Sequence, residues 1–291
     1  MTQAVVLLAH GTPDGLDDMP EYLARVRGGR PPSPELVAEM RHNYAAIGGR
    51  SPLTDITRAQ AAALSRALGG TPVYVGMRNW RPFIADTLAE AAAAGVRDLV
   101  AVPMAPQYST LSVAKYRQET ERACPAALRV RFVDSWHDHP GLLEAFAEKV
   151  REARASDEWD RVLFTAHSLP ARVVAEGDPY ADQVAATARG VAERAEVACY
   201  AQAYQSAGRT PESWLGPALE EALEAAADEG ARRVLVVPIG FVCDHTEILF
   251  DIDVQAAAAA RRLGLALGRT ASLNTSATFI RALADLVHAA S

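Results

Sequence analysis

The chain has 291 residues, of which 49% are hydrophobic and 22% are charged, and its formal net charge is -7 at pH 7. This length allows two domains of ordinary size, and the acidic balance argues against a general affinity for nucleic acid or anionic membranes. The amino-terminal stretch MTQAVVLLAHG has neither a cationic leader nor enough apolar residues to cross a bilayer, so we expect a cytoplasmic protein.

Short β-branched runs alternate with alanine-rich helical stretches, which is typical of an α/β fold with parallel sheets flanked by helices. The predicted strands, in chain order, are 4–9, 72–76, 98–103, 129–133, 161–166, 197–201 and 233–239. Three predicted helices have clear end signals. They run from Ser33-Pro34-Glu35 to Gly48-Gly49, from about Asp55 to Leu68, and from Asp178-Pro179 to about Ala195.

The sequence repeats itself coarsely. VVLLAHGTP, around His10, is echoed by VLFTAHSLP, around His167, and GVRDLVAVPMAP is echoed later by GARRVLVVPIGF. We therefore predict two similar α/β halves. The predicted division is 1–150, 151–270 and a C-terminal helix, 271–291, that packs back on the N-terminal half. Ligands of such folds lie beyond the carboxyl ends of the strands, so both histidines should face one cleft between the halves.

Several common sites have no sequence support. The chain contains no GxSxG, GxxxxGK or GxGxxG motif, which argues against a serine hydrolase, a P-loop enzyme and a dinucleotide-binding enzyme. Cys124, Cys199 and Cys243 are far apart and form no CxxC pair. We therefore expect no disulfide framework, no structural zinc site and no four-cysteine iron-sulfur cluster.

The candidate chemistry lies at two strand exits of the second half. His167 ends one strand, and the next exit delivers GFVCDHTEILFDID. If a helix begins near Asp244, then Asp244, Glu247 and Asp251 share one face, and such a row of carboxylates needs shared cations or protons. Each feature alone has a structural explanation, since a strand-end histidine is often structural and acids suit a helix N-terminus. Their convergence favours one imidazole and one carboxylate that hold a divalent metal briefly.

The remaining histidines are expected to be structural or exposed. His137 and His139, in the loop SWHDHP, could bind a metal, but the polar loop favours exposure. The same expectation applies to His42, His245 and His288, and it is weakest for His245, which lies inside the acidic run.

Seven blocks of the sequence resemble those of ferrochelatases, the enzymes that insert ferrous iron into a porphyrin in haem synthesis. From residue 5 to about 255, these blocks are AHGTP, YLARVRGGRPPSPELVAEM, YAAIGGRSPL, TAHSLP, GDPYADQV, YQSAGRTPESWLGP and PIGFVCDHTEILFDID. The resemblance implies two Rossmann-like, chelatase-type halves with a porphyrin cleft between them. It also implies that His167 and Glu247 form the catalytic, metal-handling pair, that Fe²⁺ is a substrate, and that no cofactor is permanently bound.

The resemblance also implies which residues contact the porphyrin. They are His10, Arg27, Asn43, Tyr44, Ser51 and Tyr116. Arginine suits the propionates because its guanidinium matches a carboxylate at two points. The segment GMRNWRPF is expected to line the cleft with Trp80 against the ring, or else to pack against the following helix.

The chain departs from the family pattern at three positions. His10 stands where the soluble bacterial branch commonly has a tyrosine that faces the metal from the side opposite the pair, and an imidazole there could ligate product iron more strongly. Asn43 stands where an arginine is common, and Gln255 replaces an acid that would extend the line of Asp251. The arginines that could supply the missing propionate contact are Arg30, Arg41 and Arg50.

The blocks APQYSTLSVAKY and GMRNWRPF resemble the soluble branch of the family, whose substrate is coproporphyrin III, with four propionates. The sequence also has neither a cysteine-clustered extension nor apolar membrane-binding lips, so we expect this substrate rather than protoporphyrin IX, with two. The alternatives are another tetrapyrrole chelatase, for cobalt or sirohydrochlorin, and a porphyrin or haem carrier without turnover. The expected partners are the porphyrin, ferrous iron and a haem-pathway handoff protein, with no nucleic acid and no integral membrane association.

Overall fold

A computed structural model describes residues 2–208 and 210–290 of the chain. The strands are β1 Thr2–Ala9, β2 Val73–Met77, β3 Val96–Pro103, β4 Arg129–Phe132, β5 Arg161–His167, β6 Tyr200–Gln205, β7 Arg233–Val237 and β8 Ala266–Arg269. The helices of the first 156 residues are η1 Leu16–Asp18, α1 Met19–Val26, α2 Pro34–Ala46, α3 Leu53–Ala67, α4 Ile84–Ala93, α5 Val113–Ala123 and α6 Pro140–Ser156. Those that follow are α7 Ala171–Ala175, α8 Tyr180–Arg194, α9 Leu219–Asp228, α10 Thr246–Leu249, the π-helix η2 Asp251–Ala256, α11 Ala257–Arg262 and α12 Ala277–Ala290.

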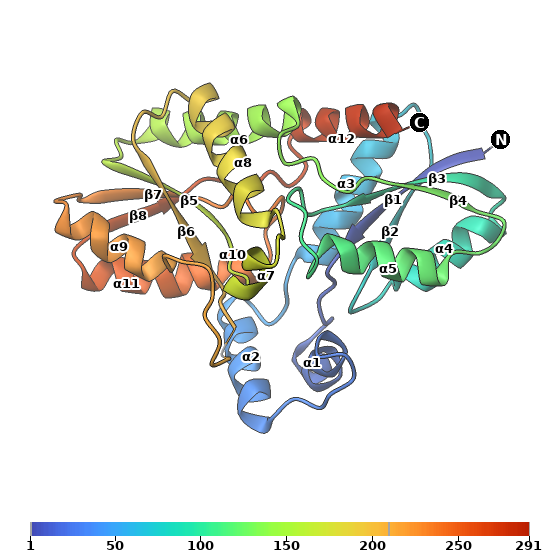
Figure 1. The fold of residues 1–291 in the computed structure, drawn as a ribbon, viewed down its shortest axis with the longest axis horizontal. Coiled ribbons are helices and arrows are strands. Elements are labelled where there is room, and N and C mark those ends of the chain that lie inside the picture. The colour runs from blue at the N-terminus through green and yellow to red at the C-terminus, as the bar shows by residue number, and fades with distance from the viewer. Residues whose placement is uncertain (1, 209, 291) are drawn as a thin grey trace.

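The strands form two parallel four-stranded sheets that lie side by side, each flanked by helices (Figure 1). The first sheet has the order β2-β1-β3-β4 and the second has the order β6-β5-β7-β8. The second order repeats the first, strand for strand, so the predicted duplication is confirmed at the level of topology. In each sheet the order reverses beside the first strand, and ligands of open α/β sheets bind at such a point.

The strand predictions hold with three differences. The strand predicted at 197–201 begins only at Tyr200, because the preceding residues complete the end of α8 and Glu196 has a φ of 53°. The strand predicted at 233–239 ends at Val237, where Pro238 has no N–H to donate. The short edge strand β8 was not predicted, since ALGR contains no β-branched residue, although the repeat of β4 required a strand there.

Two of the predicted helix starts are confirmed by capping contacts, and the helix predicted from about Asp55 begins two residues earlier, at Leu53. Ser33 Oγ accepts a hydrogen bond from the main-chain N–H of Leu36 at 3.3 Å, at the start of α2. The main-chain N–H of Tyr180 donates to Asp178 Oδ1 at 3.0 Å, at the start of α8. These contacts satisfy N–H groups that have no partner within the helix.

A shared hydrophobic core joins the two sheets on the side of α6 and α12 (Figure 1). Phe279 of α12 is fully buried and its ring stacks with that of Trp136, with 6.2 Å between the ring centroids. Polar contacts also cross between the halves. Gln60 Nε2 donates to the carbonyl of Asn274 at 2.9 Å, and Ser109 Oγ donates to Asp178 Oδ2 at 3.0 Å. The strand exits of both halves are therefore held in a fixed relation.

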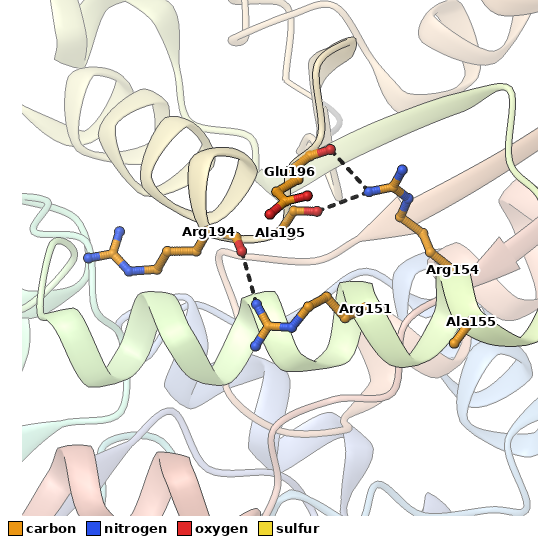
Figure 2. A pocket seen from close by; sticks show the side chains of 6 residues that line it. All are labelled: Arg151, Arg154, Ala155, Arg194, Ala195 and Glu196. Carbon is orange, nitrogen blue, oxygen red and sulfur yellow. Dashed lines mark hydrogen bonds between the residues drawn. The ribbon is translucent and has the colours of Figure 1, made fainter.

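Away from these exits, a hollow of about 400 Å³ lies between the ends of α6 and α8 (Figure 2). Arg151 Nη1 donates to the carbonyl of Arg194 at 3.0 Å, and Arg154 Nη1 donates to that of Ala195 at 2.9 Å. Both arginines thus satisfy the C-terminal carbonyls of α8. Because α6 and α8 lead into β5 and β6, this hollow lies at the amino ends of the strands. In the described part of the chain, no helix has the length and apolar character that crossing a bilayer requires.

Candidate active site

The structure brings His167 and Glu247 together, as the sequence predicted. His167 is the last residue of β5, and Glu247 lies in α10, which follows the neighbouring strand β7. The two residues therefore stand on either side of the point where the strand order of the second sheet reverses. His167 Nε2 lies 3.8 Å from Glu247 Oε1.

The Glu247 carboxylate is held in its ionised form. Burial alone would raise its pKa, but His167 and then His245 outweigh that effect and hold the pKa at about 2. His245 Nε2 lies 3.7 Å from Glu247 Oε2, and 39% of the Glu247 side chain remains exposed. The carboxylate is thus anionic at neutral pH and still accessible.

The His167 imidazole keeps one nitrogen available. Its Nδ1 contacts the carbonyl of Ser168, and a carbonyl only accepts hydrogen bonds. In the neutral imidazole the proton therefore sits on Nδ1, and the Nε2 lone pair points toward Glu247. The hydroxyl of Tyr180 donates to the main-chain carbonyl of His167 at 3.0 Å and holds the strand exit in place.

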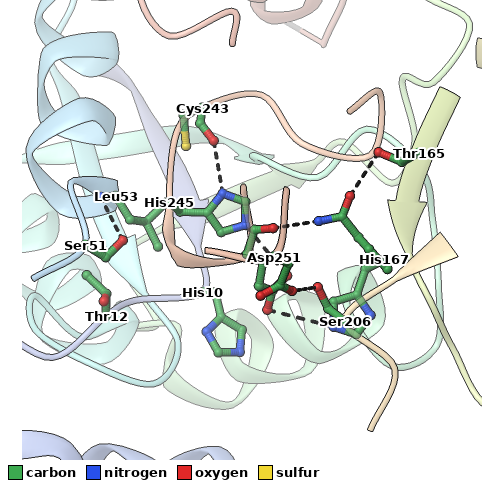
Figure 3. Close-up of polar contacts among 12 residues, drawn as sticks. His10, Thr12, Ser51, Leu53, Thr165, His167, Ser206, Cys243, His245 and Asp251 are labelled. Atoms are coloured by element: carbon green, nitrogen blue, oxygen red, sulfur yellow. Dashed lines mark hydrogen bonds and ion pairs between the residues drawn. The ribbon is translucent and has the colours of Figure 1, made fainter. Parts of the chain in front are cut away.

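Gln205 links the segments that carry His167 and Glu247. It ends β6 and is 4% exposed. Its Oε1 accepts from Thr165 Oγ1 at 2.9 Å, and its Nε2 donates to the carbonyl of Glu247 at 2.6 Å (Figure 3). Both ends of this buried amide are satisfied, so β5, β6 and α10 are fixed relative to one another.

The predicted line of acids is wrong at its first member. No helix begins at Asp244, because its carboxylate accepts from Ser272 Oγ at 2.7 Å and Asn274 Nδ2 at 2.8 Å and lies 3.4 Å from Arg269 Nη1. These contacts hold the chain extended until α10 begins at Thr246.

Asp251 and Gln255, the two later positions of that line, differ in burial and in their partners. Asp251 accepts from Ser206 Oγ (Figure 3), and burial together with the Glu247 charge raises its pKa to about 6. Gln255 is exposed and its Nε2 donates to Glu220 Oε1 at 2.8 Å, so it is bound to α9.

The raised pKa of Asp251 predicts a pH-dependent effect on stability. An unfolded aspartate titrates near 3.8, so the folded state favours the protonated form between about pH 4 and 6 and loses stability as the pH rises through this window. Asp251→Asn should therefore raise the free energy of unfolding at pH 8 by on the order of 1 to 2 kcal/mol, and by much less at pH 4. Urea unfolding at the two pH values measures this, and an equal gain at both would contradict the assignment.

His10 belongs to the N-terminal half and lies in the same region as His167 and Asp251 (Figure 3). It directly follows β1 and is half-buried. Glu247 and His167 both act on its pKa through their charges, although burial and then Arg78 dominate and lower that pKa to about 4. The prediction that both strand-end histidines face one site is thus confirmed.

The residues expected to contact a porphyrin differ in their exposure. Tyr44, Ser51 and Tyr116 are buried, Asn43 is half-buried and Arg27 is exposed. Burial raises the pKa of Tyr116 to about 12, so its hydroxyl stays protonated. The contacts of these five residues with a porphyrin stay predictions.

Trp80 is 1% exposed and packs in a small cluster with residues of α1 and α2. Its indole N–H donates to Asp14 Oδ2 at 3.0 Å. Trp80 is therefore a packed residue, which was the alternative expectation. It packs against α1 and α2, however, and not against the helix that follows it. Its contact with a porphyrin ring stays a prediction.

Sequence reasoning missed three residues of the site. His245 was expected to be structural or exposed, yet it contacts Glu247, and the spacing in DHTE was the available signal. Gln205 and Asn79 gave no signal, because their roles depend on pairings between distant segments. His139 was expected to be exposed, but it is half-buried and its Nδ1 accepts from the N–H of Gly141 at 3.2 Å at the start of α6. Among residues 2–208 and 210–290, no three His, Cys, Asp or Glu side chains form a group that could hold a metal ion.

Comparison with known proteins agrees with this arrangement. The family model described as Ferrochelatase matches residues 2–291. A ferrochelatase of Deinococcus radiodurans is 43% identical over 97% of this chain and 94% of its own, and a coproporphyrin III ferrochelatase of a Geobacillus species is 37% identical over 97% and 96%. The solved structure of SirB from Bacillus subtilis with Fe³⁺ superposes with a TM-score of 0.63 at 12% identity, covering 100% of this chain and 96% of that one, which shows a common fold. The chain therefore belongs to the ferrochelatase family and is a metal chelatase, of the lyase class, that inserts iron into a porphyrin.

Proposed function

We propose that the porphyrin substrate of this enzyme is coproporphyrin III and that Fe²⁺ insertion gives Fe-coproporphyrin III with release of two protons. The observation that carries this proposal is the charge of residues 25–81. This segment contains nine arginines and three acidic residues, within a chain whose net charge is -7. Four propionates present four negative charges, and a segment with this excess of arginines suits them better than it suits two.

Individual arginines of this segment have suitable positions. Arg27 and Arg30 are exposed just after α1. The Arg78 guanidinium lies 5.7 Å from the ring centroid of Tyr116 and its charge acts on His10. We propose that Arg27 and Arg78 bind propionates, and that Arg41 of α2 takes the role that Asn43 cannot fill.

The two members of the pair suit different tasks. With a pKa of about 2, Glu247 is a weak base but a constant negative charge, which suits attraction of Fe²⁺. The Nε2 lone pair of His167 is available, and a neutral imidazole is a common proton acceptor in enzymes, which suits removal of pyrrole protons. We therefore propose that Glu247 guides the iron and that His167 accepts the protons, which leave to solvent as two H⁺ for each Fe²⁺ inserted. Fe²⁺ is then a substrate, no cofactor is permanently bound, and the reaction takes place in the cytoplasm.

Steady-state iron insertion into the two porphyrins tests the substrate. We expect kcat/KM to be at least about 10-fold higher for coproporphyrin III than for protoporphyrin IX, the equivalent of one to two propionate contacts. Arg27→Ala should reduce the ratio of the kcat/KM values for the two porphyrins, mainly by raising the KM for coproporphyrin III. Arg66→Ala, in the last turn of α3 at the amino edge of the sheet, is the matched control and should leave the ratio unchanged. A preference for protoporphyrin IX would refute the proposed substrate.

A further inference from the structure

The His10 imidazole is held by hydrogen bonds at both of its nitrogens. Nδ1 lies 3.2 Å from the carbonyl oxygen of Gly11 and 3.2 Å from the hydroxyl of Tyr22. A carbonyl oxygen only accepts hydrogen bonds, so Nδ1 is a donor and carries a proton. Burial raises the pKa of Tyr22 well above its ordinary value, and the hydroxyl beside Nδ1 is therefore neutral.

The second nitrogen of His10 is met by a donor. With a pKa of about 4, the imidazole is neutral at physiological pH and carries only the proton on Nδ1. Nε2 then holds the one basic lone pair, and the Asn79 amide Nδ2 lies 3.0 Å from it. The amide N–H donates to that lone pair, so the only nitrogen of His10 that can bind a metal is already occupied.

The main chain holds the two side chains in this relation. The N–H of Asn79 donates to the carbonyl of His10 at 2.9 Å, and the N–H of Arg78 donates to that of Ala9 at 2.9 Å. Gly11 has a φ of +87°, and a Cβ atom there would come within 2.8 Å of the main-chain nitrogen of Trp80. The strand exit and the segment after β2 thus touch, and Asn79 is 5% exposed.

We propose that Asn79 is a positioning residue that keeps His10 from becoming a strong axial ligand of the product iron. The proposal rests on the proposed function, because the iron must lie between His10 and the His167–Glu247 pair. A neutral imidazole binds a metal through its unprotonated nitrogen, so ligation by His10 must first break the Asn79 hydrogen bond. His10 then faces the iron porphyrin product as a neutral imidazole that does not bind the iron. The product can therefore dissociate.

Histidine tautomers in the ligand-free wild-type enzyme give the first test. Nitrogen-15 NMR at pH 7 should show the His10 ring as the Nδ1–H tautomer, assigned by the loss of its signals in His10→Ala. Asn79→Asp replaces the amide donor with an acceptor of the same size and should move the proton to Nε2. Finding Nε2–H in the wild-type protein would overturn the proposal. This measurement needs no turnover, so it is independent of which porphyrin is the substrate.

The absorption spectrum of added ferric coproporphyrin III gives the second test. The wild-type complex should have no imidazole-ligand signature, and Asn79→Leu should acquire one together with a lower kcat and an unchanged porphyrin KM. The double variant His10→Ala/Asn79→Leu is the matched control and should lose the signature again. The proposal fails if the wild-type spectrum already shows imidazole ligation that His10→Ala removes, or if Asn79→Leu leaves the spectrum unchanged.

Discussion

Replacing Glu247 by glutamine is expected to lower the rate of iron insertion by about 10²- to 10³-fold, the usual range for loss of one preorganised electrostatic contact in an active site. The substitution keeps the shape of the side chain but removes the charge that attracts Fe²⁺ and replaces one acceptor oxygen with an NH₂ donor. Porphyrin affinity should change only a few-fold, because Glu247 faces the metal rather than the propionates. Insertion rates at saturating porphyrin and porphyrin binding by fluorescence quenching measure the two effects separately.

Asp253→Asn is the matched control for this substitution. Asp253 follows Glu247 by six residues but is exposed, and both its carboxylate oxygens bind Arg269, at 2.8 and 2.9 Å. We expect its insertion rate to stay within about two-fold of wild type, since its carboxylate is paired with Arg269 and not with His167 or Glu247. A porphyrin carrier without turnover would bind porphyrin equally in all three proteins and would have no insertion rate to lose. Equal rates for Glu247→Gln and the wild-type enzyme would remove Glu247 from the reaction.

Local patterns were enough to predict the fold, His167 and the acidic run that contains Glu247. The β-branched runs gave seven of the eight strands, and the paired exits at His10 and His167 gave the duplication. The acidic run was placed beside His167 because strand exits of a parallel sheet meet at one edge, and the resemblance to ferrochelatases singled out Glu247 within that run. Such features depend on short stretches of sequence and on the general geometry of α/β folds.

The rest of the site depends on contacts that no local pattern specifies. Asn79 and His10 are 69 residues apart, and their hydrogen bond exists only because the segment after β2 returns to the exit of β1. Asp244 looked like a helix residue, but its partners come from the loop after β8, a strand that the pattern did not reveal. In both cases the tertiary contact decides the role of the side chain.

The duplication has produced two equivalent histidines with different surroundings. Both imidazoles have Nδ1 against a main-chain carbonyl, so in both the lone pair is on Nε2. At His167 the group facing Nε2 is the Glu247 carboxylate, 3.8 Å away, whereas at His10 it is the Asn79 amide, 3.0 Å away. A carboxylate leaves the lone pair free for a proton or a metal, and an amide donor occupies it. The asymmetry of the site therefore arises from the partners of the two imidazoles.

Replacing His167 by alanine is expected to lower iron insertion by about 10²- to 10⁴-fold as well, since the proposed proton acceptor is lost. If the two residues act as a unit, the double variant His167→Ala/Glu247→Gln should be little slower than the slower single variant, because the first substitution already disables the pair. Insertion rates of the four proteins, measured at one pH with matched porphyrin saturation, complete the cycle. Losses that multiply, so that the double variant falls by the product of the two single effects, would mean that the residues act independently and would contradict a pair that acts as a unit across 3.8 Å.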